Sequence, residues 1–254
     1  MFVGLSLGPS QSHIINIGTL SVSELLSSKK TSFFGSVEFG YFFSKYIGLS
    51  SGIGYFSYKT QLTLDNYQRK FNTIDIDNES YERRISGSDI KEVQNIDFLS
   101  IPICINIRLP LNETIGFFLQ PGVNLLIPFS KKYQTSGTFS YKGYYSAYNL
   151  LLENLPDYGF PSNINIESDG ELELKPYGFN ATASAGFDFL IQKKIQIAVA
   201  ACYDKSLSNI SEYSSPDKFQ LSSDADQINC LMGGSSKATA QSMGLKIIFR
   251  YYLK

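Results

Sequence analysis

Two neighbouring segments decide the fold: residues 179–191, FNATASAGFDFLI, and residues 195–204, IQIAVAACYD. In both, bulky apolar residues fall on one parity, and small or polar residues fall mostly on the other. A β-strand sends successive side chains to opposite faces, so each segment should have one apolar face and one small, polar face. Only residues 192–194, QKK, separate the two runs. Two alternating runs joined by so few polar residues predict a β-hairpin.

Both runs are long for strands of a globular domain. Such strands usually hold about 5–6 residues, whereas a tilted strand that crosses a membrane needs about 9–11. The length of the two runs therefore indicates that lipid lies against the apolar face.

Composition limits the class of protein. The chain has 254 residues, a formal net charge of −1, 18% charged residues and 14% aromatic residues. No linker composition divides it, so we expect one domain over residues 1–254, and no apolar run is long enough for a membrane-spanning helix. Near-neutral charge argues against nucleic acid, which needs a basic surface. Cys104, Cys202 and Cys230 have no disulfide or metal-ligand spacing, and we expect them to be buried.

The same alternation recurs along the chain. The expected strands lie near residues 2–8, 34–44, 47–64, 96–109, 115–127, 177–191, 195–207 and 242–253. The segments 9–32, 65–94, 128–176 and 208–238 are polar and are expected to be long loops, with a short helix at 147–155. Tight turns are expected at 45–46, 110–114 and 192–194. Pro102 and Pro121 fall inside strands, where proline removes a ladder donor, so we expect a bulge at each.

Long and short connections alternate, so a meander would place every long loop at one end. This pattern predicts an all-β fold: an eight-stranded antiparallel up-and-down transmembrane β-barrel with four long loops on one side and three tight turns on the other. The alternative is a soluble, lipocalin-like barrel with the apolar parity inside. The less apolar parity is rich in Gly, Ala, Ser and Asn, which suits a crowded interior, and the apolar parity is nearly free of charge. Both observations favour the membrane barrel.

The last third of the chain carries a family resemblance. Residues 178–211, GFNATASAGFDFLIQKKIQIAVAACYDKSLSNIS, and residues 241–253, QSMGLKIIFRYYL, resemble the small outer-membrane β-barrel domain family of Bacteroidota-type bacteria, including PorT-like proteins. The most recognisable positions are Gly186, Tyr203–Asp204, Ser206–Leu207 and Gly244. The resemblance implies an outer-membrane location, lipid as a partner and no shared catalytic residues. Met1 is followed at once by a strand, without a signal peptide, which indicates a trimmed chain or a misassigned start.

Several charges lie on the inward parity of the expected strands. They are Glu38, Arg108, Asp188, Asp204, Lys246 and Arg250. Because buried charge is costly unless it is paired, we expect them to form ion pairs that fill the lumen. Counting from the tight turns places Asp188, Ala198 and Arg250 at similar height. The barrel should then be plugged.

No residue pattern predicts catalysis, a cofactor or a metal site. His13 has Ser10, Ser12 and Glu24 near it in sequence, as a lipid hydrolase on the barrel rim would need, but no nucleophile motif surrounds it. Asp75, Asp77 and Glu79 begin like a calcium loop, but the required Gly and closing Glu are missing. The mixed-charge run at 81–92 is expected to be solvated; the alternative is contact with lipopolysaccharide or a partner.

The third long loop is crowded with tyrosine. Its members are Tyr133, Tyr141, Tyr144, Tyr145, Tyr148 and Tyr158. Tyr among Ser and Gly suits an adaptable contact surface, although a self-packed cap over the barrel mouth would use the same residues. We therefore expect a non-enzymatic structural or binding barrel that presents extracellular loops to a protein partner, including as an accessory of a secretion or surface-assembly complex. The alternatives are a narrow transport pore, a rim enzyme and the soluble ligand-binding barrel.

Overall fold

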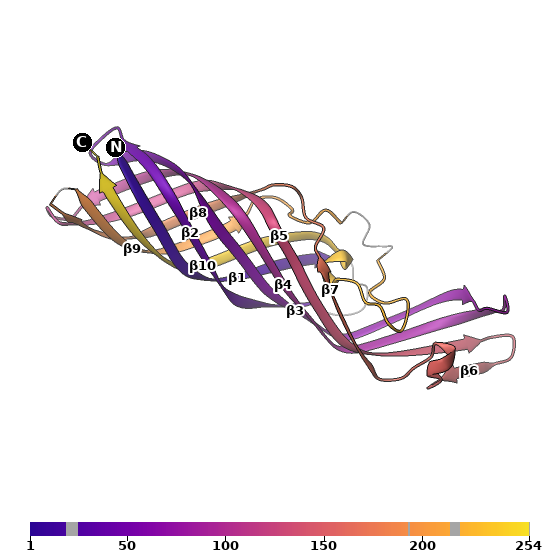
Figure 1. The fold of residues 1–254 in the computed structure, drawn as a ribbon. Coiled ribbons are helices and arrows are strands. Elements are labelled where there is room, and N and C mark those ends of the chain that lie inside the picture. The colour runs from indigo at the N-terminus through magenta and orange to yellow at the C-terminus, as the bar shows by residue number, and fades with distance from the viewer. Residues whose placement is uncertain (19–24, 193, 214–218, 254) are drawn as a thin grey trace.

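The computed structural model describes residues 1–18, 25–192, 194–213 and 219–253 (Figure 1). Its elements are almost all strands. They are β1 (Phe2–Gly18), β2 (Leu26–Phe42), β3 (Ile47–Ile74), β4 (Ser80–Pro110), β5 (Ile115–Tyr145), β6 (Leu150–Glu153), β7 (Ile164–Glu171), β8 (Gly178–Ile191), β9 (Ile195–Ser206) and β10 (Ser235–Tyr252), with the 3-10 turns η1 (Pro156–Tyr158) and η3 (Leu231–Gly234). None of the described helical segments is long and apolar enough to cross a membrane.

Eight of the strands close into a ring. The order is β1–β2–β3–β4–β5–β8–β9–β10, β10 pairs back with β1, and all of these pairs are antiparallel. β6 and β7 lie outside the ring and pair with β5. The predicted eight-stranded antiparallel barrel is confirmed.

The tight turns and both termini lie at one end of the barrel (Figure 1). β2 joins β3 through residues 43–46, and β4 joins β5 through residues 111–114. The third turn, at 192–194, includes Lys193, which lies outside the described residues. The Leu253 N–H donates to the Met1 carbonyl over 2.9 Å, which ties the two chain ends together.

The apolar parity faces outward, as the membrane barrel requires. Val3, Leu5 and Leu7 are 41–49% exposed, while Gly4, Ser6 and Gly8 between them are buried in the lumen. The same pattern continues around the ring, and we call these outward residues the apolar belt. Its members include Val37, Phe39, Ile53, Ile103, Val123, Phe187, Val199, Leu245, Ile247 and Phe249. A belt of this extent would cause aggregation in water.

The strands are much longer than the alternation predicted. β3 continues to Ile74, β4 begins at Ser80, and β5 continues to Tyr145. The expected loop at 65–94 is therefore wrong, and so is the first part of the expected loop at 128–176. β1 and β2 likewise extend into the expected loop at 9–32, and β10 begins at Ser235 within the expected loop at 208–238. The mixed-charge run at 81–92 is also wrong as a solvated loop, because it lies in β4 with alternate residues buried.

A change of apolar parity explains these errors. In β3 the odd residues Leu49, Ile53 and Tyr55 are apolar and exposed, whereas beyond them the even residues Tyr58 and Leu62 are apolar and fully buried. The strand continues without interruption across this point. Once the outer face meets water instead of lipid, the apolar residues must lie inside. On β3 the alternation therefore persists with the opposite phase, and the outer half of the strand resembles a polar loop in the sequence.

Two smaller expectations are also wrong. Residues 147–155 are not a helix: Asn149 adopts φ 48° in a turn, and β6 then pairs with the end of β5. Asn tolerates this left-handed conformation, which suits a hairpin turn. Pro102 and Pro121 cause no bulge, since the register passes through Pro102–Asn124 and Pro121–Ala183 unchanged.

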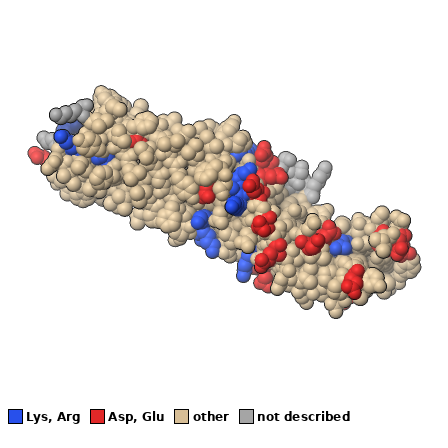
Figure 2. Space-filling model, in the orientation of Figure 1, with Lys and Arg blue, Asp and Glu red and all other residues tan. Residues whose placement is uncertain are grey.

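Beyond the barrel, the long strands form an arm, which we define as residues 64–90 and 135–171. It points away from the end that holds the termini (Figure 1). Its inner face packs Ile85, Ile90 and Phe139 against Leu221 and Leu231 of the segment before β10. Charged side chains are sparse over the barrel half and gather from the base of the arm outward (Figure 2).

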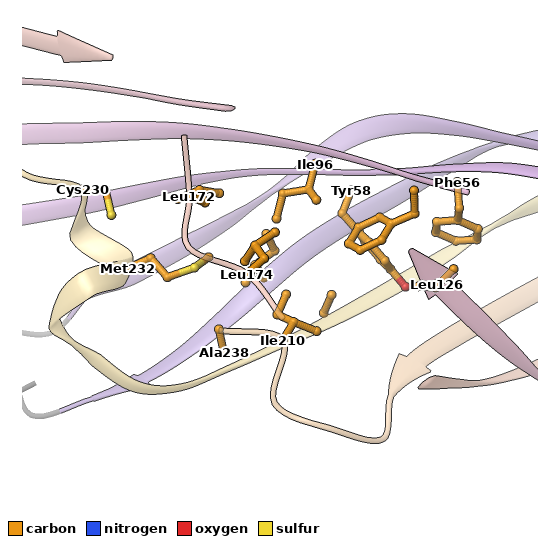
Figure 3. Close-up of a cluster of buried hydrophobic side chains, with 13 residues drawn as sticks. Phe56, Tyr58, Ile96, Leu126, Leu172, Leu174, Ile210, Cys230, Met232 and Ala238 are labelled. Carbon is orange, nitrogen blue, oxygen red and sulfur yellow. The ribbon is translucent and has the colours of Figure 1, made fainter. Parts of the chain in front are cut away.

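A second apolar cluster closes the mouth of the barrel (Figure 3). Tyr58 and Leu126 project from the wall strands, and Leu174, Ile210 and Met232 come from the connecting segments. The mouth is therefore filled by side chains from η3 and from the segments that follow β7 and β9.

The apolar belt predicts where a charge is costly. Ile247→Arg, halfway along the belt on β10, should lower the free energy of unfolding by about 2–4 kcal/mol in phosphatidylcholine vesicles. Ser86→Arg, on the exposed outer face of the arm, is the matched control and should change it little. Urea unfolding of both variants measures the difference, and equal costs would contradict the placement of the belt in lipid.

Candidate functional site

The lumen holds a polar layer near the tight-turn end. Arg250 on β10 pairs with Glu38 on β2, with 3.0 Å between Nε and Oε1. Its Nη2 also donates to Asn106 Oδ1 over 2.8 Å, and its guanidinium lies 4.6 Å above the ring of Phe2. Gln120 Nε2 donates to Glu38 Oε2 over 3.2 Å. Arg250 and Glu38 are 2% and 3% exposed, so this pair is removed from water.

Arg108 and Asp188 form a second pair across the β4, β5 and β8 walls. Arg108 Nη2 lies 2.7 Å from Asp188 Oδ1, and Asp188 is fully buried. Asp188 lies opposite Ala198, as expected, but Arg250 lies opposite Gln196 and not at the height of Ala198. Arg250 therefore takes Glu38 as its partner, and Asp188 takes Arg108.

Lys246 and Asp204 line a small cavity above these pairs. Lys246 Nζ donates to Gln120 Oε1 over 2.9 Å, and Asn124 Nδ2 donates to Asp204 Oδ1 over 3.1 Å. The cavity measures about 40 Å³, which is room for roughly two or three water molecules. Buried Cys104 also lines it. Gln120 and Asn106 thus link Glu38, Arg250 and Lys246, while Asn124 bonds to Asp204 separately. Sequence parity marked the charges but not these amides.

Aromatic side chains close the polar layer on both sides. At the tight-turn end, the Phe2 ring lies 5.8 Å from both Phe42 and Tyr252. Toward the arm, Phe56 lies 5.7 Å from Phe34 and 4.9 Å from Tyr58. The lumen is therefore packed with side chains along its axis, as expected for a barrel of eight strands.

A buried carboxylate joins the base of the arm to the segment before β10. Glu92 on β4 is fully buried and accepts hydrogen bonds from Gln94 Nε2 at 2.6 Å and Thr135 Oγ1 at 2.7 Å. The Leu231 N–H donates to the same carboxylate over 2.5 Å. These donors are neutral, and burial raises the pKa of Glu92. Glu92 lies in the expected loop at 65–94, so it was not among the predicted buried charges. The signal for its burial is the parity that it shares with buried Ile90 and Ile96.

The six tyrosines of the third loop separate into two groups. Tyr141 and Tyr145 are buried, and Tyr141 Oη donates to the Asp224 carbonyl over 2.7 Å. Tyr133 packs against the mouth cluster. Tyr144 lies under Arg84, whose guanidinium is 4.5 Å from the ring centroid. Only Tyr148 and Tyr158 of the six are strongly exposed, at 62% and 74%.

Tyrosine–carboxylate hydrogen bonds clamp the tip of the arm, which we define as residues 74–84 and 142–160. Tyr145 Oη donates to Asp75 Oδ2 over 3.0 Å, and Tyr148 Oη donates to Glu79 Oε1 over 2.7 Å. Asp75 Oδ1 also accepts the N–H groups of Asp77 and Glu79, both at 2.9 Å. The acidic run thus forms the β3–β4 turn, and the clamps hold this hairpin to the β5–β6 hairpin.

The residues weighed for rim chemistry do not assemble into a site. His13 Nε2 lies 2.8 Å from Gln241 Nε2, while Ser10 Oγ bonds to Ser32 Oγ and Ser12 Oγ donates to the Lys59 carbonyl. Glu24 lies outside the described residues. Within the ranges that the structure describes, no group of three or more His, Cys, Asp or Glu side chains could hold a metal ion.

The buried ion pair predicts a non-additive mutant series. Arg250→Met leaves the Glu38 carboxylate buried without its cation and should cost about 3–5 kcal/mol of unfolding free energy. The double variant Glu38→Gln/Arg250→Met should recover much of that loss, because no isolated charge remains. Urea unfolding measures each variant, with exposed Lys45→Met as the control. Additive losses in the double variant would contradict the pairing.

The hydrogen bonds that Glu92 accepts from Gln94, Thr135 and Leu231 predict a pH dependence. Since the folded-state pKa is raised, the stability that this group contributes is fully present below its unfolded value and is lost as the pH rises through the folded pKa. The Leu231 amide should therefore exchange its hydrogen faster, after correction for intrinsic rates, as the pH rises from acid to neutral. Glu92→Gln should flatten this slope. A wild-type slope of the opposite sign would disprove the assignment.

Comparison with known proteins places the chain in a family. The family model "Outer membrane protein beta-barrel domain" matches residues 2–212. Among solved structures, Ail, the attachment invasion locus protein of Yersinia pestis, is 12% identical, with 98% of each chain covered and a TM-score of 0.34. OprG from Pseudomonas aeruginosa is 13% identical over 98% of this chain and 94% of its own, with a TM-score of 0.35. No curated protein matches the chain.

The family match covers most of the chain, including nine of the strands and every member of the lumen layer except those on β10. The apolar belt gives the same assignment on physical grounds, because only a lipid environment accommodates it. The chain therefore belongs to the outer membrane protein beta-barrel domain family and resides in the outer membrane.

Proposed function

We propose that this protein is a non-enzymatic outer-membrane scaffold whose arm binds a protein partner outside the cell. Barrels of this class place short turns in the periplasm and longer connections outside, which would direct the arm to the exterior. The observation that carries the proposal is the exposed apolar tip. Ile76 is 98% exposed, and Tyr158 is 74% exposed, at the far end of the arm from the belt.

The tip lies well beyond the lipid. From Tyr55, where the belt ends on β3, the strand continues to Ile74, and at about 3.3 Å per residue this is roughly 60 Å of strand path. Apolar groups at that distance cannot be explained by contact with the surrounding membrane. Exposed apolar surface that is rimmed by polar residues is typical of protein–protein contact sites.

The arm holds its tip rigidly. Residues 82–88 of β4 pair with both β3 and β5, so the arm is a continuous sheet and not a set of separate loops. Its inner face has an apolar core, and the Tyr145 and Tyr148 clamps join the two hairpins. A pre-organised surface loses little conformational entropy when a partner binds. This construction supports a recognition role.

The packed lumen argues against the transport alternatives. A pore needs a continuous wet path, whereas the ion pairs and the two aromatic layers occupy the axis of the barrel. The soluble lipocalin-like alternative needs an apolar interior with space for a ligand, and here the apolar parity faces outward. Both alternatives are less consistent with the geometry than a scaffold role.

A PorT-like role as an accessory of a secretion or surface-assembly complex is a narrower form of the same proposal. It follows from the resemblance of residues 178–211 and 241–253, which are strands of the barrel and their flanks. The arm would supply the contact surface that such a complex requires. This form therefore depends on the binding role of the arm.

Site-specific photo-crosslinking in intact cells tests the binding role. A photoreactive amino acid at Tyr158 or Ile76 should form a discrete crosslinked product with a partner protein. The same amino acid at Ser86, on the exposed wall of the arm, is the control and should not form that product. Identical crosslinking from all three positions, or none from the tip, would contradict the proposed function.

A further inference from the structure

We infer that the tip of the arm recognises a cationic protein segment that also carries apolar side chains. This inference rests on the proposed function and adds the chemistry of the partner. Its starting point is the apolar surface of the tip. The exposed members, all more than one-third accessible, are Ile74, Ile76, Tyr148, Leu150, Leu151, Leu155 and Tyr158.

Acidic side chains lie among these apolar residues. Ile76 is flanked in sequence by Asp75 and Asp77, and Tyr158 follows Asp157. Asp77 and Asp157 are exposed. Figure 2 shows acidic side chains predominating at the far end of the arm. A partner that covers the apolar residues must therefore approach these carboxylates as well.

Internal ion pairs neutralise only part of this charge. Arg84 Nε lies 2.6 Å from Glu82 Oε1, and Lys142 pairs with Glu153. Across the described residues of the tip, this leaves four acidic side chains without a cation in an ion pair. They are Asp75, Asp77, Glu79 and Asp157.

The remaining cation of the tip is directed inward. Arg83 is 8% exposed, and its guanidinium lies 5.2 Å from the Tyr141 ring centroid and 5.9 Å from that of Phe160. Its Nη2 donates to the Gly159 carbonyl over 3.4 Å. Arg83 therefore stabilises the core of the tip beneath the surface, and the outer side stays acidic.

Charge excludes the other occupants of an apolar surface. A second copy of the chain would bring an equally acidic tip against this one, and like charges across an interface are costly. Anionic lipid and nucleic acid would be repelled for the same reason. A cation-rich protein segment gains from the carboxylates and buries the isoleucine and tyrosine side chains, so it satisfies both features of the surface.

Two of the four acidic residues hold the tip together and two do not, so charge can be removed without disturbing the fold of the tip. Asp75 and Glu79 accept the tyrosine hydrogen bonds that hold the tip together. Asp77 and Asp157 take no part in the Tyr145 and Tyr148 clamps and lie on the surface. Asp77→Asn/Asp157→Asn should therefore remove charge and leave the clamps intact, whereas Ile76→Ser/Tyr158→Ser should remove apolar contact and leave the charge.

Binding of two synthetic peptides to the full chain in phosphatidylcholine nanodiscs tests the inference. One peptide alternates Lys with Leu, and the other has Glu in place of Lys. We expect the Lys peptide to bind and the Glu peptide not to. Asp77→Asn/Asp157→Asn removes two exposed carboxylates that could pair with lysines of the peptide. It should therefore weaken Lys-peptide binding roughly three- to ten-fold at low salt and reduce the salt dependence of binding. The apolar variant should weaken binding at every salt concentration.

Empty nanodiscs measure background binding to lipid. The variant Ser86→Asp, on the arm but outside the tip, is the control for a mutation elsewhere and should bind as the wild type does. Equal binding of the two peptides, or binding that neither tip variant weakens, would overturn the inference. If the tip crosslinks to a partner in cells but prefers the Glu peptide, the inference that the partner is cationic is overturned, and the proposed function stands. If the tip also forms no crosslink in cells, both the proposed function and the inference about the partner are overturned.

Discussion

The medium outside each strand decides which of its two faces is apolar. In the belt, lipid requires apolar residues outside, and the lumen accepts Gly, Ser and paired charges. Above the belt, water requires the reverse. β3 shows both arrangements in one uninterrupted strand, with Tyr55 exposed in the first and Leu62 buried in the second. The closed lumen, the mouth cluster and the cored arm all follow from this inversion.

The barrel could be predicted from sequence because eight apolar runs share a period of two and tight turns separate them in alternation. The arm could not, because its strands keep the period but exchange the faces, and their outer sides are as polar as loops. Residues 81–92 illustrate this: Glu82 and Arg84 face out, whereas Tyr81, Arg83 and Ile85 are buried. Allowing the apolar parity to invert would have extended β3 to Leu64. On β5 the register shift beside Phe129 changes which parity faces inward, so odd residues are apolar and exposed at Val123 and apolar and buried at Phe139.

Parity also located the lumen charges but not their partners. The choice of Glu38 for Arg250 depends on which strands face each other across the ring, and on Asn106 and Gln120 between them. Strand neighbours can be counted from the turns, but contacts across the lumen depend on tilt and side-chain length. In the same way, a list of six tyrosines could not separate buried Tyr141 from exposed Tyr158.

The inversion on β3 also bears on how such chains can change length over evolution. Adding one residue above the belt would turn Leu62 and Tyr67 toward water and destroy the packed interior of the arm. Adding two residues to each strand of a hairpin keeps every side chain on its own side. Relatives should therefore differ in arm length by even steps, except where a bulge such as the one at Phe129 on β5 absorbs a single residue. The reach of the tip can then vary while the membrane-embedded cylinder stays the same.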